Sequence, residues 1–310
     1  MVETPVLFIT FCRPDYARQT WNGIKAAKPK KLYFYSNKGR EEKEGEVERN
    51  NEIRSYINEI DWDCDLHTFF RDECVNVYDS LRGAINWLFE NESEGIILEE
   101  DCVPTLAFFS YIDQLIVKFR GNEKIWCISG DNWFNYQSHN YDYHFSHYHF
   151  MYGWATWREK WQRVDWQNLG AKEAVRNHIF RPLFKNREQS RYREKEVMRV
   201  KDFVEKTKCW DYYWGIIMDQ NEALTVHPKC NLIHNIGVSG THHENGTRES
   251  IVNAPATIQD QTYTIVNEPS CLEADKDFDL VVYKALFKPA PLPVRAVNKA
   301  IRILKSCLKH

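Results

Sequence analysis

The chain has 310 residues, enough for one large α/β domain with appendages or for two small domains. Its 43% hydrophobic and 27% charged residues exclude a largely disordered protein. A formal net charge of −3 gives no strongly basic surface, so the sequence predicts no nucleic-acid partner.

Strands and helices alternate along the first 130 residues. The run Val6–Phe11 is continuously apolar, β-branched and aromatic, which is typical of a strand buried on both faces of a parallel sheet. Further strands are expected at residues 31–36, 64–70, 95–98 and 125–128, and helices at 16–27, 53–60 and 77–89; the charged run 39–50 is expected to be a solvated loop or a helix start. This order predicts an α/β fold with a doubly wound, mostly parallel sheet.

Polar clusters follow three of the expected strands. They are Arg13-Pro14-Asp15, Glu99-Glu100-Asp101 and Ser129-Gly130-Asp131-Asn132. Any strand must end in something polar, but ligands of open α/β sheets bind beyond the carboxyl ends of the strands. The three clusters therefore predict one ligand site at this edge of the sheet.

The acidic triplet Glu99-Glu100-Asp101 follows a buried Ile-Ile-Leu strand. Three adjacent carboxylates repel one another and lose solvation there, and a divalent cation would remove that cost. Hard oxygen ligands suit Mg²⁺ or Mn²⁺, which usually keep positions open for phosphate oxygens. Alternation along the strand places Glu99 and Asp101 on one face and Glu100 on the other.

A family resemblance appears in seven short blocks that occur in one order over roughly residues 5–245. The block Glu94–Pro104 resembles the DxD region of bacterial GT-A glycosyltransferases of the hemolytic-protein HlpA-like type, which look distantly similar to N-acetylglucosaminyltransferase I. The other matching blocks are residues 11–15, 84–89, 128–132, 152–157, 210–214 and 228–237. The resemblance implies a GT-A (nucleotide-diphospho-sugar transferase) fold and transfer of a sugar from a nucleotide-sugar donor.

Carried over to these positions, the resemblance implies a metal site and a donor site. Asp101 would be the direct metal ligand with Glu99 beside it, and His242, or its neighbour His243, would complete the site. The donor site would include Arg13 at the diphosphate, Glu100 near the ribose or sugar, Asn37 at the base and Asp131 at a sugar or acceptor hydroxyl. Relatives often carry Asp at the positions of Glu100 and Asn37, so base identity is open and a UDP-sugar is favoured.

The resemblance also implies a catalytic base. An inverting transferase needs one carboxylate to take the proton of the acceptor hydroxyl, and Asp211 stands among aromatic residues that would exclude water. Without the resemblance, an Asp in this setting is more typical of a helix cap. The acceptor would contact Trp154, Trp157, Trp210 and Trp214, although the block around Trp154 and Trp157 is equally consistent with a packing motif.

Other functions remain as alternatives. A nucleotidyltransferase would normally carry a glycine-rich loop after the first strand, and Phe11–Asp15 has no glycine. A catalytically inactive sugar-nucleotide-binding relative is disfavoured by the retained acids and Asp211. A hydrolase with two carboxylates would need no metal. The preferred hypothesis is an inverting, metal-dependent transferase that builds a bacterial surface polysaccharide or lipopolysaccharide from a glycan or lipid-linked acceptor.

The C-terminal part changes in character. We expect a GT-A domain over 1–250, an extension packed on it over 251–288, and a Pro spacer with a basic amphipathic helix over 289–310 that lies on an anionic membrane surface or docks on its own domain. The charged tract 185–208 predicts a solvent-facing helix. Nine scattered cysteines and a start without a basic n-region predict a cytoplasmic protein.

Overall fold

A computed structural model describes residues 1–237, 251–257 and 262–288, in which eight strands form one mixed sheet. In spatial order they are β3 (Asp65–Phe70), β2 (Lys31–Ser36), β1 (Val6–Thr10), β4 (Glu94–Glu99), β8 (Trp154–Trp157), β6 (Ile125–Ser129), β9 (Leu224–Pro228) and β7 (Tyr143–Ser146). Only β8 and β7 run antiparallel to their neighbours. The mostly parallel α/β sheet predicted from the sequence is confirmed.

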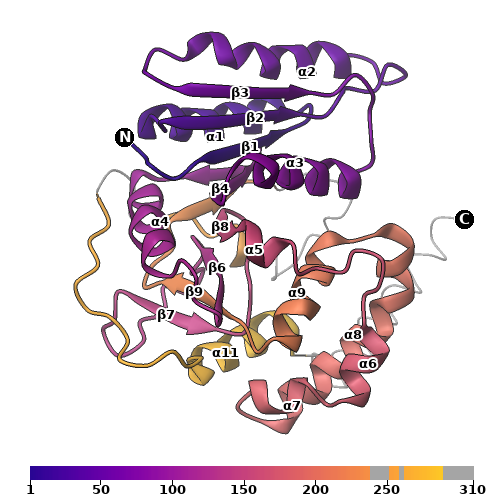
Figure 1. Ribbon diagram of the computed structural model, residues 1–310, viewed down its shortest axis with the longest axis vertical. Helices are drawn as coiled ribbons and strands as arrows, with labels where there is room; N and C mark the ends of the chain where they lie inside the picture. The colour runs from indigo at the N-terminus through magenta and orange to yellow at the C-terminus, as the bar shows by residue number, and fades with distance from the viewer. Residues whose placement is uncertain (238–250, 258–261, 289–310) are drawn as a thin grey trace, which may run out of the picture.

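Helices cover both faces of this sheet (Figure 1). They are α1 (Pro14–Ala27), α2 (Glu46–Arg54), α3 (Val77–Asn91), α4 (Leu106–Lys118), α5 (Arg158–Trp161), α6 (Ala171–Arg176), α7 (Phe180–Leu183), α8 (Arg187–Thr207), α9 (Trp210–Gln220) and α11 (Lys276–Val282), with a 3₁₀ turn η1 (Ser55–Glu59) and a π-helical turn η2 (Tyr283–Phe287). A separate two-stranded sheet pairs β5 (Cys102–Pro104) with β10 (Ile233–Asn235).

Alternate residues of each strand enter two different cores. Val6 and Phe8 of β1 pack with α1 and α4, whereas Leu7 and Ile9 pack with α3 and α9 on the opposite face. All five β1 residues are buried. Burial on both faces is the physical reason why this strand is apolar without alternation, as the sequence predicted.

Two helices differ from expectation. The helix expected at 53–60 begins earlier, at Glu46 within the charged run, because Asn50 donates from Nδ2 to the backbone oxygens of Phe11 and Asn37 and so fixes α2 on the ends of β1 and β2. The charged helix α8 is not simply solvent-facing. Its residues Val197 and Val204 are fully buried, which places one face of the helix in a core.

The C-terminal residues that the structure describes pack on the β7 edge. Asp279 of α11 accepts hydrogen bonds from Ser146 Oγ and from the backbone N–H of His147, and Phe278 contacts the rings of His144 and His227. The expected tail helix 289–310 lies outside the described residues. Within the described part of the chain, no helix is both long enough and apolar enough to cross a membrane.

Candidate active site

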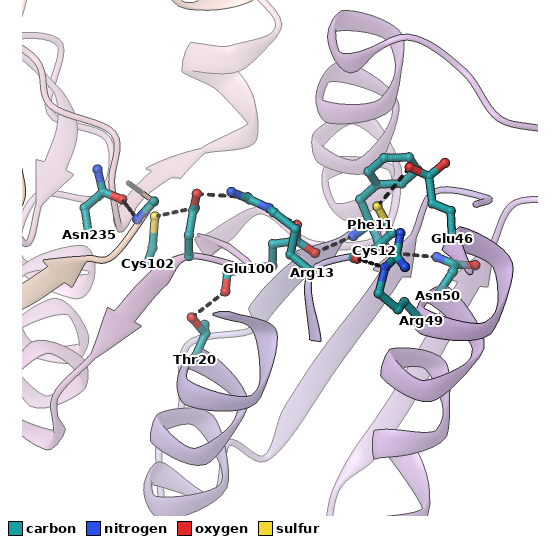
Figure 2. A network of polar contacts seen from close by, with 12 residues as sticks. Phe11, Cys12, Arg13, Thr20, Glu46, Arg49, Asn50, Glu100, Cys102 and Asn235 are labelled. Carbon is teal, nitrogen blue, oxygen red and sulfur yellow. Dashed lines mark hydrogen bonds and ion pairs between the residues drawn. The ribbon is translucent and has the colours of Figure 1, made fainter. Parts of the chain in front are cut away.

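The carboxyl ends of β1 and β4 are joined by one arginine. Arg13 donates from Nε to Glu100 Oε1 at 2.6 Å and from Nη2 to Asp101 Oδ2 at 2.9 Å. Glu100 also accepts from the backbone N–H of Phe11 at 2.7 Å, and its carbonyl accepts from Thr20 Oγ1 at 3.0 Å. Figure 2 shows Arg13 at the centre of this network, beside Glu100. The positive charge of Arg13 therefore partly neutralises the acidic triplet.

Glu99 lies apart from this arginine network, toward α9. Burial raises the pKa of Glu99 to about 8, and the negative charges of Asp101, Glu100 and Asp211 act in the same direction while Arg13 opposes them. The electrostatic influence of Asp211 on Glu99 shows that the first turn of α9 lies near the end of β4. Asp211 is exposed, so the structure brings the expected base to the edge of the acidic cluster from 110 residues away in the sequence.

Glu99 and Asp211 open into one cavity of about 630 Å³. Its walls come from α3, the segment 147–152, α8, the start of α9 and the end of η2. The lining is rich in aromatic and aliphatic side chains and includes Val77, Tyr78, Leu81, Trp133, Tyr148, Phe150, Met151, Tyr152, Phe184, Tyr192, Phe203, Trp210, Tyr212, Leu286 and Phe287. Sequence analysis did not identify Leu286 and Phe287 as cavity residues, because nothing in their spacing marks a binding wall.

Three of the four expected acceptor tryptophans are core residues. Trp154, Trp157 and Trp214 are at most 2% exposed and do not line the cavity, so in this structure they are packing residues, and their expected contact with the acceptor stays a prediction. Trp154 and Trp157 are buried because β8 lies between β4 and β6, where helices cover both faces of the sheet, whereas Trp214 lies on the face of α9 that packs in a core. Trp210 does line the cavity, and Trp154 stacks behind it at a ring distance of 5.9 Å.

Asp131 supports the cavity wall from inside the protein. The side chain is fully buried, and burial raises its pKa to about 7. It accepts hydrogen bonds from Trp133 Nε1 at 3.1 Å, from the backbone N–H of Tyr152 at 3.3 Å and from Ser129 Oγ at 3.2 Å. In this structure Asp131 positions Trp133 and Tyr152, two residues that line the cavity, and its expected contact with a sugar or acceptor hydroxyl stays a prediction.

The Asn37 side chain likewise forms hydrogen bonds within the protein. Its Nδ2 donates to the Val75 carbonyl at 2.8 Å, and its Oδ1 accepts from the backbone N–H groups of Val75 and Lys38 at 3.2 and 3.0 Å. The side chain is 5% exposed. These bonds join the end of β2 to the segment after β3, and they occupy the oxygen that was expected to accept from a nucleotide base.

The chain returns to the acids at Gly237. The backbone N–H of Ile236 donates to the Asp101 carbonyl at 2.9 Å, and a Cβ on Gly237 would lie 2.4 Å from Asp101 Oδ2. Only glycine allows this approach. His242 and His243 follow shortly after in the sequence and lie outside the described residues, so their expected role at the metal stays a prediction.

A Gly237→Ala substitution should therefore disturb the acids although it replaces none of them. The added methyl group must displace the Asp101 carboxylate or the chain that carries it, and we expect nucleotide affinity to fall about tenfold. Gly83→Ala is the matched control, because the atom nearest its new Cβ is the flexible end of Arg71. Calorimetric titration of both variants checks this; equal affinities would contradict it.

The carboxylates at the end of β4 are the candidate ligands for a divalent cation. Among residues 1–237, 251–257 and 262–288, no group of three or more His, Cys, Asp or Glu side chains is arranged to hold a metal ion. Glu99 and Asp101 nevertheless carry hard oxygen donors at the end of β4, close enough for the charge of Asp101 to raise the pKa of Glu99. Two carboxylates completed by substrate phosphate oxygens are a usual arrangement for Mg²⁺. The chemistry of the pair therefore fits such an ion.

Comparisons with known proteins were made for the whole chain. No family model and no curated protein matches it. HddC from Yersinia pseudotuberculosis is a similar solved structure at 9% identity, covering 51% of this chain and 78% of HddC with a TM-score of 0.33. The glycosyltransferase GlyE of Streptococcus pneumoniae TIGR4 is similar at 13% identity, covering 58% of this chain and 38% of GlyE with a TM-score of 0.29. The matched region thus spans well under half of GlyE, and neither similarity bears on the activity of this chain.

Proposed function

We propose that this chain is an inverting, metal-dependent glycosyltransferase that moves a sugar from a nucleoside-diphosphate sugar, preferably a UDP-sugar, to an acceptor hydroxyl. One observation carries the proposal: Glu99, which is electrostatically coupled to Asp101, and Asp211 line the same cavity from two different elements. A donor diphosphate held at the acids and an acceptor in the cavity would then meet beside an exposed carboxylate. The resemblance in the sequence blocks points to the same reaction.

In this reaction the acceptor oxygen forms a bond to the anomeric carbon while the bond from that carbon to the diphosphate breaks. Asp211 takes the hydroxyl proton, and the nucleoside diphosphate leaves with the electron pair. Attack from the face opposite the leaving group inverts the anomeric configuration. The aromatic side chains of Trp210 and Tyr212 flank Asp211 in the cavity lining and limit the water that competes with the acceptor.

The other roles follow from the contacts around the acids. Asp101 and Glu99 would hold Mg²⁺ or Mn²⁺, which when bound neutralises charge developing on the leaving diphosphate. Arg13 keeps Asp101 and Glu100 in place and is one-third exposed, so its guanidinium also lies within reach of an incoming phosphate. A bacterial surface polysaccharide or lipopolysaccharide precursor remains the proposed acceptor class.

Nucleotide binding tests this proposal directly. We expect one of UDP, GDP or CMP to bind the wild-type protein by calorimetry only when Mn²⁺ is present, and the Asp101→Ala variant to lose that binding. Asp61→Ala is the control, because this carboxylate is 77% exposed and pairs with Lys28 on the surface. Failure of all three nucleotides to bind, with and without Mn²⁺, would overturn the proposed activity in favour of a non-catalytic relative.

A further inference from the structure

The cavity beside Asp211 has walls made largely of stacked rings. Trp133 and Phe150 pack at a centroid distance of 4.2 Å. Tyr148 stacks on Phe287 at 5.4 Å with an interplanar angle of 11° and contacts Phe184 at 5.6 Å. These rings come from four separate segments of the chain, so the apolar wall is assembled by the tertiary fold. Its surface suits a ligand part that has little need of hydrogen bonds.

Three of the charged groups in the wall are engaged with one another. Arg193 Nη2 donates to Asp219 Oδ2 at 2.9 Å, and Arg193 Nη1 lies 3.6 Å from Glu196 Oε2. His147 Nδ1 lies 3.3 Å from the Ala223 carbonyl oxygen. A sugar chain bound here would need these groups for its many hydroxyls, and they are already used inside the protein.

One polar atom of the wall lacks a partner. His149 Nδ1 is buried and forms no hydrogen bond with any residue that the structure describes. Burial lowers the pKa of His149 to about 3, so the ring is neutral. Its other edge packs against Gly215, where a Cβ would lie 2.5 Å from Nε2. A single polar atom within an otherwise apolar ligand, such as a linking oxygen, would satisfy Nδ1.

The rim of the cavity exposes further apolar surface. Phe203 of α8 is 56% exposed and Val77 of α3 is 66% exposed, and both belong to the cavity lining. Large apolar side chains left this exposed around a cavity are typical of a binding surface. An apolar group longer than the cavity would be able to extend across them.

We propose that the acceptor is amphiphilic: its hydroxyl end lies at Asp211 and Glu99, and an alkyl or aryl group attached to that end occupies the aromatic cavity. The inference rests on the proposed function for the assignment of Asp211 and deepens it by naming the class of acceptor. Glu99 and Asp211 supply the polar end of the site, and the stacked rings, the buried His149 Nδ1 and the rim supply the apolar end.

The probes are n-octyl β-D-glucoside below its micelle-forming concentration and methyl β-D-glucoside, which differ only in alkyl length. Trp133 and Trp210 in the lining report binding by fluorescence. We expect the octyl compound to bind the wild-type protein at least about tenfold more tightly than the methyl compound. Equal affinities, or tighter binding of a methyl disaccharide than of octyl glucoside, would overturn the inference.

Variants at the rim locate the binding. Phe203→Ser should weaken octyl glucoside binding about fivefold or more, since it removes a large apolar contact. The matched control is Val117→Ser on α4, because Val117 is 58% exposed and does not line the cavity. Val77→Ser is the second variant should Phe203→Ser not fold. Equal losses in the rim and control variants would overturn the assignment to this cavity.

A parallel titration with UDP and Mn²⁺ separates the two proposals. If octyl glucoside binds in a way that depends on Phe203 but no nucleotide binds, the amphiphile site is supported and the proposed transferase activity is overturned. Nucleotide binding that depends on Asp101, without preference for the octyl chain, would keep the transferase and overturn the amphiphilic acceptor.

Discussion

Replacement of Asp211 by Asn is expected to lower the rate of sugar transfer by about 10²–10⁴-fold, the usual contribution of a general base. The amide keeps the size of the side chain but cannot take the acceptor proton. Because Asp211 lies on the acceptor side of the acids, nucleotide affinity should change by less than about twofold. This is the result expected when a mutation removes an interaction that is made only in the transition state. The measurement is release of the nucleoside diphosphate with the donor identified by the binding experiments.

The matched control for this variant is Asp202→Asn. Asp202 is 82% exposed on α8, so its replacement by Asn should leave both the rate and the nucleotide affinity unchanged. Thermal unfolding of both variants shows whether the fold is intact. An Asp211→Asn protein that folds, binds nucleotide and transfers sugar at the wild-type rate would remove Asp211 from the mechanism.

The second large effect is expected at Arg13. An Arg13→Met substitution leaves Glu100, which is 4% exposed, without its ion-pair partner. Removal of one partner from a buried pair typically costs about 3–5 kcal/mol, and because Arg13 is one-third exposed we expect about 2–3 kcal/mol here. Urea denaturation gives the free energy of unfolding, and nucleotide titration shows whether the acids still bind.

A double variant separates the charge effect from lost packing. In Arg13→Met with Glu100→Gln, the neutral amide oxygen still accepts from the Phe11 N–H but no longer places an unpaired charge in the interior. We expect this pair to recover most of the stability lost by Arg13→Met alone, so the two changes should be strongly non-additive. Simple addition of two separate losses would show that Arg13 stabilises the fold through packing.

The sequence predicted the framework well because local patterns govern it. The run Val6–Thr10 and the triplet after β4 were identifiable from periodicity and from the cost of buried charge. The sequence did not predict that Arg13 forms an ion pair with Glu100, because two residues 87 positions apart leave no local signal. Nor did it predict that the tryptophans of β8 are buried, since the antiparallel insertion of β8 is a property of the whole sheet.

The position of β8 also determines how the protein can be dissected. This strand is hydrogen-bonded to β4 on one side and to β6 on the other, yet it follows both in the chain. A truncated protein that ends before Trp154 would leave the inner edges of β4 and β6 without a neighbour and open to intermolecular pairing. N-terminal fragments that carry the acids should therefore aggregate when expressed alone, and biochemical work on the donor site needs a chain that extends at least through β8 and β9.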